Sequence, residues 1–315
     1  MENIFRLYYC CLLLICVAPL AAQPDSTFIR LFDNKARINT GLKFRDRSAI
    51  FSTKTGEEFK LENTGLDYRI GGRYKFLAYT FSIPLSDLGT GTDERESKNF
   101  GLGLTLFLRQ YLASGRIRMT TGFRSTTADG ASVFREDVKL FTGTFYGFHV
   151  LNNKRYSLRA SFKQRDRQLK SGGSLLLGGL IDRQRLKADS AGILVPFENG
   201  EMNLLNRYAQ TKFGVGVGYA HTFLIGGRWF FTPFLIAGPE FRFVSYDVRE
   251  GTRQRSRFHL SGRLRGYAAF GWNGRRTAIG LTSTYIPTLD KTDNLDTRVR
   301  DLAVELRLTW RFLYR

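Results

Sequence analysis

The sequence predicts an all-β fold, a transmembrane antiparallel up-and-down β-barrel of about 12 strands. Three observations lead to this prediction. An apolar N-terminal segment is typical of export. Many segments of about ten residues alternate apolar side chains with polar or small ones, as strands of a membrane barrel do. Short and long connections between these segments alternate as well, like periplasmic turns and extracellular loops.

Residues 1–22 have the three parts of a secretory signal peptide. Arg6 supplies positive charge, the run 7–18 is apolar, and Ala21 and Ala22 offer small residues for cleavage. The apolar run is shorter than the roughly 20 residues that a membrane-spanning helix needs, so an anchor helix is the less favoured alternative. We expect export through a cleaved signal peptide and one β-barrel domain at 23–315, in the cell outer membrane of a Gram-negative bacterium.

The mature chain is expected to be basic and free of cysteine. All three cysteines lie in the signal segment, which excludes disulfides and cysteine-ligated metals from the barrel. The 48 Lys and Arg residues exceed the 28 Asp and Glu residues, giving a formal net charge of +20. Such a charge favours nucleic acid, anionic lipid or anionic solutes as partners, and export argues against nucleic acid.

The segment from Leu302 to Tyr314 shows the strand pattern most clearly. Its even positions carry only Leu, Val, Trp, Phe and Tyr, whereas Glu305, Arg307 and Arg311 lie between them. Because successive side chains of a strand point to opposite faces, one face is apolar and the other polar. The same pattern predicts strands at 35–44, 64–71, 76–84, 98–110, 115–124, 138–150, 155–167, 211–224, 229–246, 257–272, 277–288 and 299–314.

The apolar residues of these segments are assigned to the lipid face. Two of the sets are Val138, Leu140, Tyr146, Phe148 and Val150, and Tyr156, Leu158, Ala160 and Phe162. Alternating aromatic residues in the last strand also resemble the signal that barrel-assembly machinery reads, although the chain ends at Arg315.

The connections leave the strand count open between twelve and fourteen. Short turns are predicted at 71–75, 111–114, 152–154, 226–228 and 273–276, and long loops at 45–63, 85–97, 125–137, 168–210, 247–256 and 289–298. Residues 172–184 could form a strand of their own. They either fold into the loop 168–210 or pair with a further strand in 185–200, which would make fourteen strands.

Residues 162–179 read FKQRDRQLKSGGSLLLGG. This run resembles a motif of the form E-R-Q-x-K-S-A-G-S from an uncharacterised family of outer-membrane β-barrels of Bacteroidota, domain of unknown function 4421. Asp166 and Gly172 depart from that motif. The resemblance implies an outer-membrane barrel and no particular activity. The motif-like residues are Arg167, Gln168, Lys170, Ser171, Gly173 and Ser174.

No arrangement of residues in the sequence predicts catalysis, a cofactor or a metal site. Strand parity places His149 and His259 inside the barrel and His221 on the lipid side. None of them comes with the nucleophile and orienting acid that an acyl-transfer site needs. Scattered histidines without cysteine also argue against a transition metal. We expect a protein that is not an enzyme and that uses no cofactor.

Charge segregation gives the functional prediction. Acidic residues gather in the predicted loops, and basic residues occupy inward strand positions. Charges on the lipid face cost about 2–4 kcal/mol each near the midplane, so these side chains should face a wet interior. The lumenal, anion-binding candidates are Arg109, Arg118, Arg155, Arg159, Lys163, Arg263, Arg265 and Arg307.

These observations favour a pore or binding barrel for anionic solutes, with an Arg- and Lys-lined lumen as the selectivity element. The alternative is a plugged structural or envelope-interaction barrel. Its working surface would be the loop 168–210 and the segment RQLKSGGS at 167–174, folded inward or presented to a partner. An envelope-lipid enzyme is less favoured, and a soluble secreted β-sandwich is the alternative fold. Expected partners are outer-membrane lipid, lipopolysaccharide, barrel-assembly machinery and, for a pore or binding barrel, small anionic solutes.

Overall fold

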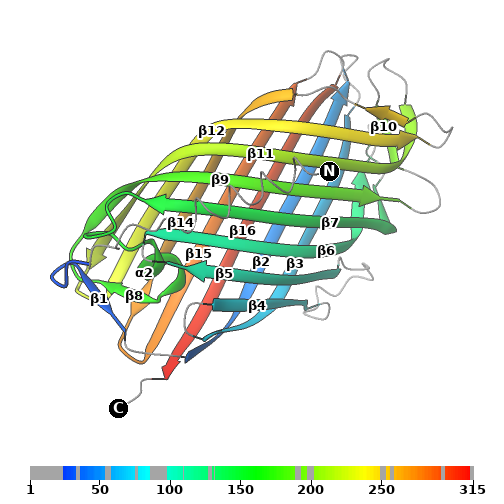
Figure 1. The fold of residues 1–315 in the computed structure, drawn as a ribbon. Helices are drawn as coiled ribbons and strands as arrows, with labels where there is room; N and C mark the ends of the chain where they lie inside the picture. The colour runs from blue at the N-terminus through cyan, green and yellow to red at the C-terminus, as the bar shows by residue number, and fades with distance from the viewer. Residues whose placement is uncertain are drawn as a thin grey trace, which may run out of the picture.

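Twelve strands form a closed antiparallel barrel (Figure 1). The computed structural model describes residues 24–32, 36–53, 58–74, 77–85, 98–108, 110–126, 130, 132–188, 193–196, 202–248, 253–255, 259–291 and 295–312. The wall strands are β2 (Ala36–Thr53), β3 (Glu58–Tyr74), β4 (Leu77–Pro84), β5 (Lys98–Phe107), β6 (Tyr111–Thr126), β7 (Ser132–Val150), β9 (Gly172–Lys187), β11 (Met202–Ile225), β12 (Trp229–Val248), β14 (His259–Asn273), β15 (Thr277–Lys291) and β16 (Leu295–Phe312).

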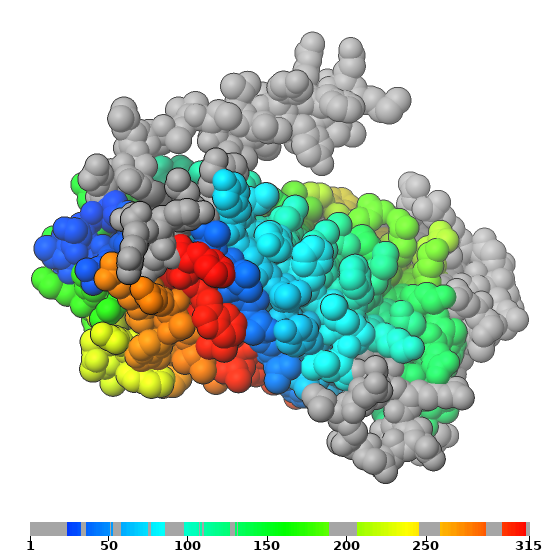
Figure 2. Space-filling model, turned by 90° about the horizontal axis from the view of Figure 1, so that it is seen from below, coloured from blue at the N-terminus to red at the C-terminus, as the bar shows by residue number. Residues whose placement is uncertain are grey.

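Each wall strand pairs with the wall strands before and after it in the chain, and the first and last wall strands pair to close the barrel. β16 pairs with β2, with Trp310 opposite Ile38. Figure 2 shows these two strands, red and dark blue, side by side on the outer wall. β4 and β5 are short, so β3 and β6 also pair directly beyond them, with Leu61 opposite Ser125. The predicted up-and-down barrel of twelve strands is confirmed.

The two ends of the barrel differ in their connections. We call the end where β11 passes into β12 the turn end, because residues 226–228 alone separate these strands. Gly226 and Gly227 have φ values of +57° and +75° there, which favour glycine. At the opposite end, the loop end, β2 and β3 remain paired as far as Ser52 and Glu58. The predicted loop 45–63 is therefore wrong, because most of it extends these two strands.

The outward face of the barrel is an apolar belt. On β11, Val215 and Val217 are 58% and 56% exposed, and on β16 Leu306 is 47% exposed. Exposed large apolar side chains occur on each of the twelve wall strands. A soluble sandwich would bury such a face against a second layer, whereas a membrane barrel turns it to hydrocarbon. The alternation therefore gives the lipid face of most strands correctly.

The predicted strand at 155–167 is wrong. Residues Leu158–Lys163 form a short helix, α2, and Asp166–Gln168 form β8, which pairs with β1 (Ile29–Leu31) inside the turn end. The Ser157 side chain accepts a hydrogen bond from Ala160 N at the start of α2, as an N-cap does. The apolar alternation of this segment serves burial inside the barrel. We call α2, β8 and the residues that join them the plug.

The missing seventh wall strand is β9, in the segment whose role the sequence left open. It pairs with β7 on one side and β11 on the other. Leu175 and Leu177 point outward, and Leu176 and Leu180 are buried inside. Because β9 meets hydrocarbon on one face and apolar side chains on the other, its sequence lacks alternation. The count of twelve was right although one of the strands was misplaced.

The assignment of β7 was wrong in the same way. Phe148 and Val150 are buried inside the barrel, and Phe145 and Val133 lie on the outer face. His149, opposite Tyr111 on β6, consequently faces outward and not into the lumen. Parity alone cannot tell an apolar inner face from a lipid face when the interior also contains apolar side chains.

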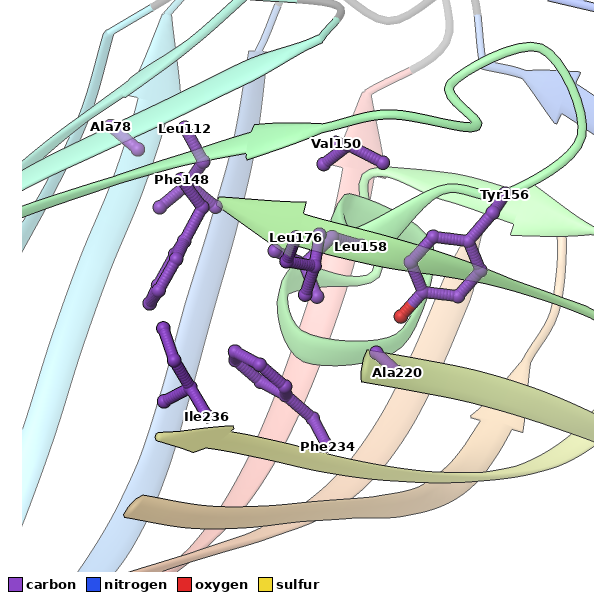
Figure 3. Close-up of a cluster of buried hydrophobic side chains, with 10 residues drawn as sticks. All are labelled: Ala78, Leu112, Phe148, Val150, Tyr156, Leu158, Leu176, Ala220, Phe234 and Ile236. Carbon is purple, nitrogen blue, oxygen red and sulfur yellow. The ribbon is translucent and has the colours of Figure 1, made fainter. Parts of the chain in front are cut away.

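The inward residues of β7 and β9 contribute to three layers, and Figure 3 shows the one at the turn end. The turn-end cluster consists of Ala78, Leu112, Phe148, Val150, Tyr156, Leu158, Leu176, Ala220, Phe234 and Ile236. The loop-end cluster consists of Phe59, Leu61, Phe123, Val138, Leu140, Leu186 and Ala188. Between them, Thr142, Thr144, Asp182 and Gln184 line a polar middle layer. Within the described residues, no helix is long and apolar enough to cross a membrane.

Candidate functional site

The middle layer of the barrel contains a cavity of about 190 Å³. It lies between the plug and the loop-end cluster, and strands from all sides of the barrel contribute to its lining. Eight basic and three acidic side chains line it: Lys43, Arg47, Arg69, Arg116, Arg118, Lys163, Arg265 and Arg307, with Asp182, Asp301 and Glu305. Because so many inward positions of these strands carry Lys or Arg, the cavity is strongly cationic.

One acidic side chain of the cavity is shared between two arginines. Glu305 forms ion pairs with Arg69 and with Arg307, whose Nε lies 2.8 Å from the carboxylate. Asp67 on β3, which does not line this cavity, pairs with Arg45 at 2.7 Å. Buried carboxylates placed in this way offset nearby arginine charges. They do not balance the whole set.

Six basic side chains of the cavity have no carboxylate partner within the part of the chain that the structure describes. They are Lys43, Arg47, Arg116, Arg118, Lys163 and Arg265. Lys43 and Arg265 are buried, and the Nε of Arg265 has no hydrogen-bond partner among these residues. Like charges about 8 Å apart cost roughly 2 kcal/mol per pair at an effective dielectric constant of 20. An anion in the cavity would relieve this repulsion.

Arginines of the wall donate hydrogen bonds to the carbonyl groups at the C-terminal end of α2 and so attach the plug to the wall. Arg307 donates to Phe162 O at 2.9 Å, Arg37 donates to Lys163 O, and Arg311 donates to Gln164 O at 2.5 and 3.2 Å. The final carbonyl groups of a helix lack partners within the helix, and positive charge is favourable at this end. Gln164 ends α2 in the left-handed conformation with φ of 44°.

Lys163 projects from the plug into the cavity. It lies on α2, outside the strands that span the membrane. Burial lowers the pKa of its ammonium group well below the ordinary value, and the charges of Arg307, Arg69 and Arg116 lower this pKa further, against the opposing effect of Glu305. Its charged form is therefore costly unless an anion lies nearby.

The motif-like residues fasten the plug to the turn end of the barrel. Arg167 donates to Gly227 O at 2.8 Å, and Gln168 donates to Arg155 O at 2.6 Å and accepts from Ser157 N at 3.1 Å. Lys170 Nζ lies 5.2 Å from the Phe28 ring centroid. The hydroxyl of Ser171 accepts from Leu224 N at 3.0 Å, and that of Ser174 accepts from Asn152 N at 2.8 Å. At Gly173, a Cβ would lie 2.8 Å from Ala220 O, which leaves no room for a side chain.

Asp166 completes this attachment. It forms an ion pair with Arg159 at 2.8 Å, accepts from the Ser157 hydroxyl at 2.8 Å, and its carbonyl accepts from Asn273 Nδ2 at 2.8 Å. The motif thus has a structural role in seating the plug.

The predicted anion-binding residues are only partly brought together. Arg118, Lys163, Arg265 and Arg307 line the cavity. Arg155 is wrong as a lumenal residue, because it is exposed at the turn end with its guanidinium 5.2 Å from the Phe28 ring. Arg159 is engaged by Asp166 in the plug. Arg109 lies outside the described residues.

Arg263 belongs to a second, smaller cavity of about 50 Å³. The two cavities share Arg47, Asp182 and Arg265. Arg263 precedes Arg265 on β14, whose first residue is at the loop end, so the smaller cavity extends the larger one in that direction. Lys212 also lines it. A basic track therefore leads from the loop end to the main cavity.

Sequence reasoning did not select Lys43, Arg47, Arg69 and Arg116 as site residues. Lys43, Arg69 and Arg116 lie at inward positions of predicted strands, and this position was the available signal for them. Arg47 lies in the predicted loop 45–63. Gln164 and Asn273 gave no signal, because their role depends on the plug. Among the described residues, no group of three His, Cys, Asp or Glu could hold a metal ion.

A family model described as a domain of unknown function, DUF4421, matches residues 23–312. This chain belongs to the DUF4421 family. The resemblance seen in residues 162–179 is confirmed at the level of the family, and origin in Bacteroidota stays a prediction. A comparison with curated proteins finds no match.

Several solved structures resemble the DUF4421 barrel in fold. The outer-membrane protease OmpT from Escherichia coli has a TM-score of 0.44 at 9% identity, over 89% of this chain and 97% of that one. The Bordetella autotransporter BrkA β domain has 0.39 at 14%, over 87% and 99%. The P. putida toluene transporter TodX has 0.35 at 8%, over 89% and 91%. The DUF4421 chain has an outer-membrane barrel fold, and its activity has to be argued from its own interior.

Proposed function

We propose that this DUF4421 protein is an outer-membrane barrel that binds a small anionic solute in its central cavity. The solute would reach the cavity from the loop end, where the basic track begins, and the plug would close the turn end. The proposal includes export through a cleaved signal peptide, insertion by barrel-assembly machinery, and lipid and lipopolysaccharide around the apolar belt. It includes no catalytic step.

The observation that supports binding most directly is the charge of the cavity. Eight basic side chains face three acidic ones, and six of the basic groups lack a carboxylate partner among the described residues. A single carboxylate, Glu305, already serves two arginines. Unpaired charge inside a protein is costly, and it is retained where a ligand or solvent compensates it.

The test is binding of inorganic phosphate to the detergent-solubilised full chain at low salt, measured by equilibrium dialysis. The double variant Arg118→Gln, Arg265→Gln removes two cavity charges and should weaken binding more than about tenfold. Arg275→Gln, which removes an exposed charge from the turn before β15, is the matched control and should bind as the unaltered protein does. Equal phosphate binding by all three proteins would contradict the proposal.

The plug supports a second candidate function, a closed structural or envelope-interaction barrel. Tyr156, Leu158 and Ala160 are buried inside the turn end, and three wall arginines hold the end of α2. Planar-bilayer recording separates the candidates when combined with dialysis. A protein that neither binds phosphate nor conducts ions fits the closed barrel. Phosphate binding with low conductance fits an anion-binding barrel whose plug is seated.

A further inference from the structure

The wall of the central cavity has a cationic part and an aromatic part. Toward the turn end it is formed by Tyr146, Phe148, Phe162, Phe234 and Tyr267. Phe234 stacks on Tyr267 at 4.9 Å between ring centroids and meets Phe148 edge to face at 5.4 Å. Phe162, from the plug, meets Tyr267 edge to face at 6.3 Å. These five residues form what we call the aromatic floor.

The basic groups lie beside and above this floor. On β14, Tyr267 is the neighbouring inward residue to Arg265 on the turn-end side. On β6, Arg116 and Arg118 lie on the loop-end side of Leu112, which packs in the turn-end cluster. Lys43 comes from β2. A ligand in the cavity therefore meets cations toward the loop end and aromatic rings toward the turn end.

We propose that the ligand is an aromatic oxyanion, a compact ring that carries one carboxylate or phosphate group; this inference rests on the proposed function. The oxyanion faces Lys43, Arg116 and Arg118, and the ring lies on the aromatic floor. A simple inorganic anion would use only the cationic part and leave the floor against water.

The size of the cavity suits such a molecule. An apolar cavity of about 150 Å³ in another protein holds benzene, so about 190 Å³ accommodates a ring with a small charged group. Tyr146, Phe162 and Tyr267 are only partly buried, so their rings retain surface that a ligand can cover. Removal of this apolar surface from water provides the preference for a ring.

The test compares benzoate, acetate and benzyl alcohol as ligands for the detergent-solubilised full chain, by isothermal titration calorimetry in one detergent and buffer. Benzoate should bind at least about tenfold more tightly than either of the other two, because only benzoate uses both parts of the wall. This comparison uses the unaltered protein and does not depend on any variant folding.

A matched pair of variants on one strand locates the effect. Tyr267→Leu removes a ring from the aromatic floor and should reduce the preference for benzoate over acetate severalfold. Phe270→Leu removes a lipid-facing ring from the same strand, where Phe270 is 43% exposed, and should leave the preference unchanged. Arg118→Gln should weaken benzoate and acetate alike.

The outcomes distinguish the two proposals. If benzoate and acetate bind equally well and both weaken in Arg118→Gln, the aromatic ligand is refuted and the anion-binding barrel stands. If benzyl alcohol binds as well as benzoate, the cationic part does not contribute to benzoate binding and the aromatic oxyanion is refuted, whereas the phosphate measurement decides on the anion-binding barrel. If none of the three ligands binds and phosphate does not bind either, both proposals fail as well.

Discussion

Replacing Arg311 with glutamine should release the plug from the barrel wall. Arg311 donates to Gln164 O at 2.5 Å, to Gly274 O at 2.7 Å and to Asn273 Oδ1 at 2.6 Å. It thereby links the end of α2 to the turn between β14 and β15. No other described residue joins these two segments through as many hydrogen bonds.

The magnitude follows from the bonds lost. Hydrogen bonds that involve a charged donor contribute about 1.5–3 kcal/mol each, so the two bonds from Arg311 to Gln164 O, which join the wall to the plug, together account for about 3–6 kcal/mol. A glutamine amide replaces part of one bond, which leaves a loss of about 3 kcal/mol in the free energy of plug docking. This corresponds to a roughly hundredfold rise in the undocked population.

Native-state hydrogen exchange measured by mass spectrometry reports this population. The amide of Arg165 is bonded to Arg159 O at 3.0 Å and that of Leu169 to Phe28 O at 2.7 Å. A helix as short as α2 and a strand pair as short as β1–β8 are stable only when packed, so both amides should lose protection when the plug leaves the wall. Their exchange should accelerate by roughly a hundredfold in Arg311→Gln, because exchange follows the open population when closing is fast. Peptides from the β11–β12 pair should exchange at unchanged rates and serve as the internal reference.

Two results would refute this reasoning. Unchanged exchange at Arg165 and Leu169 would mean that Arg311 does not hold the plug. Equal acceleration in the plug and in the β11–β12 pair would mean that the substitution destabilises the whole barrel. Arg275→Gln, one turn residue away from the plug contacts and exposed, should leave all of these rates as they are.

Three further predictions test the plug, the lipid face and the cavity. The variant Ser161→Cys, Thr232→Cys should form a disulfide on oxidation, since the two hydroxyl oxygens are 2.7 Å apart and residues 23–315 contain no other cysteine. A non-reducing gel that shows no change in migration would place the plug elsewhere. Val217→Arg should lower the free energy of unfolding from vesicles by about 2–4 kcal/mol in a urea titration, and a negligible loss would argue against a lipid-facing β11. Burial lowers the pKa of Lys163 below 10.5, so its charge is lost as pH rises toward that value and benzoate binding should fall with increasing pH. Lys163→Arg should flatten the pH dependence of benzoate binding, because arginine stays charged. An unaltered pH dependence in that variant would exclude Lys163 as the cause.

The alternation of β16 and β11 made the barrel predictable. Every outward residue of a membrane strand must suit hydrocarbon, and this requirement acts on each residue separately. Leu306 and Val217 therefore reveal their surroundings through their own chemistry. Together with the alternation of short and long connections, this pattern favoured an even number of strands, twelve or fourteen, and the structure decided for twelve.

The inward side of the wall was less predictable. A lumenal position accepts a cation, as at Arg118, or a large apolar side chain, as at Phe148, according to what lies opposite. Only the position of the plug decides between these. The leucines of β9 and the alternation of residues 155–163 were misread for this reason, since both pack against each other inside the turn end.

The sequence by itself determined most of the membrane strands, the apolar belt outside β7 and β9, the cationic character of the interior and the family. The tertiary structure alone decided that residues 156–168 leave the wall and pack inside one end, and which basic side chains meet around one cavity. The physical reason is that every outward side chain contacts hydrocarbon and must therefore be apolar, whereas each inward side chain packs against particular neighbours from distant parts of the chain.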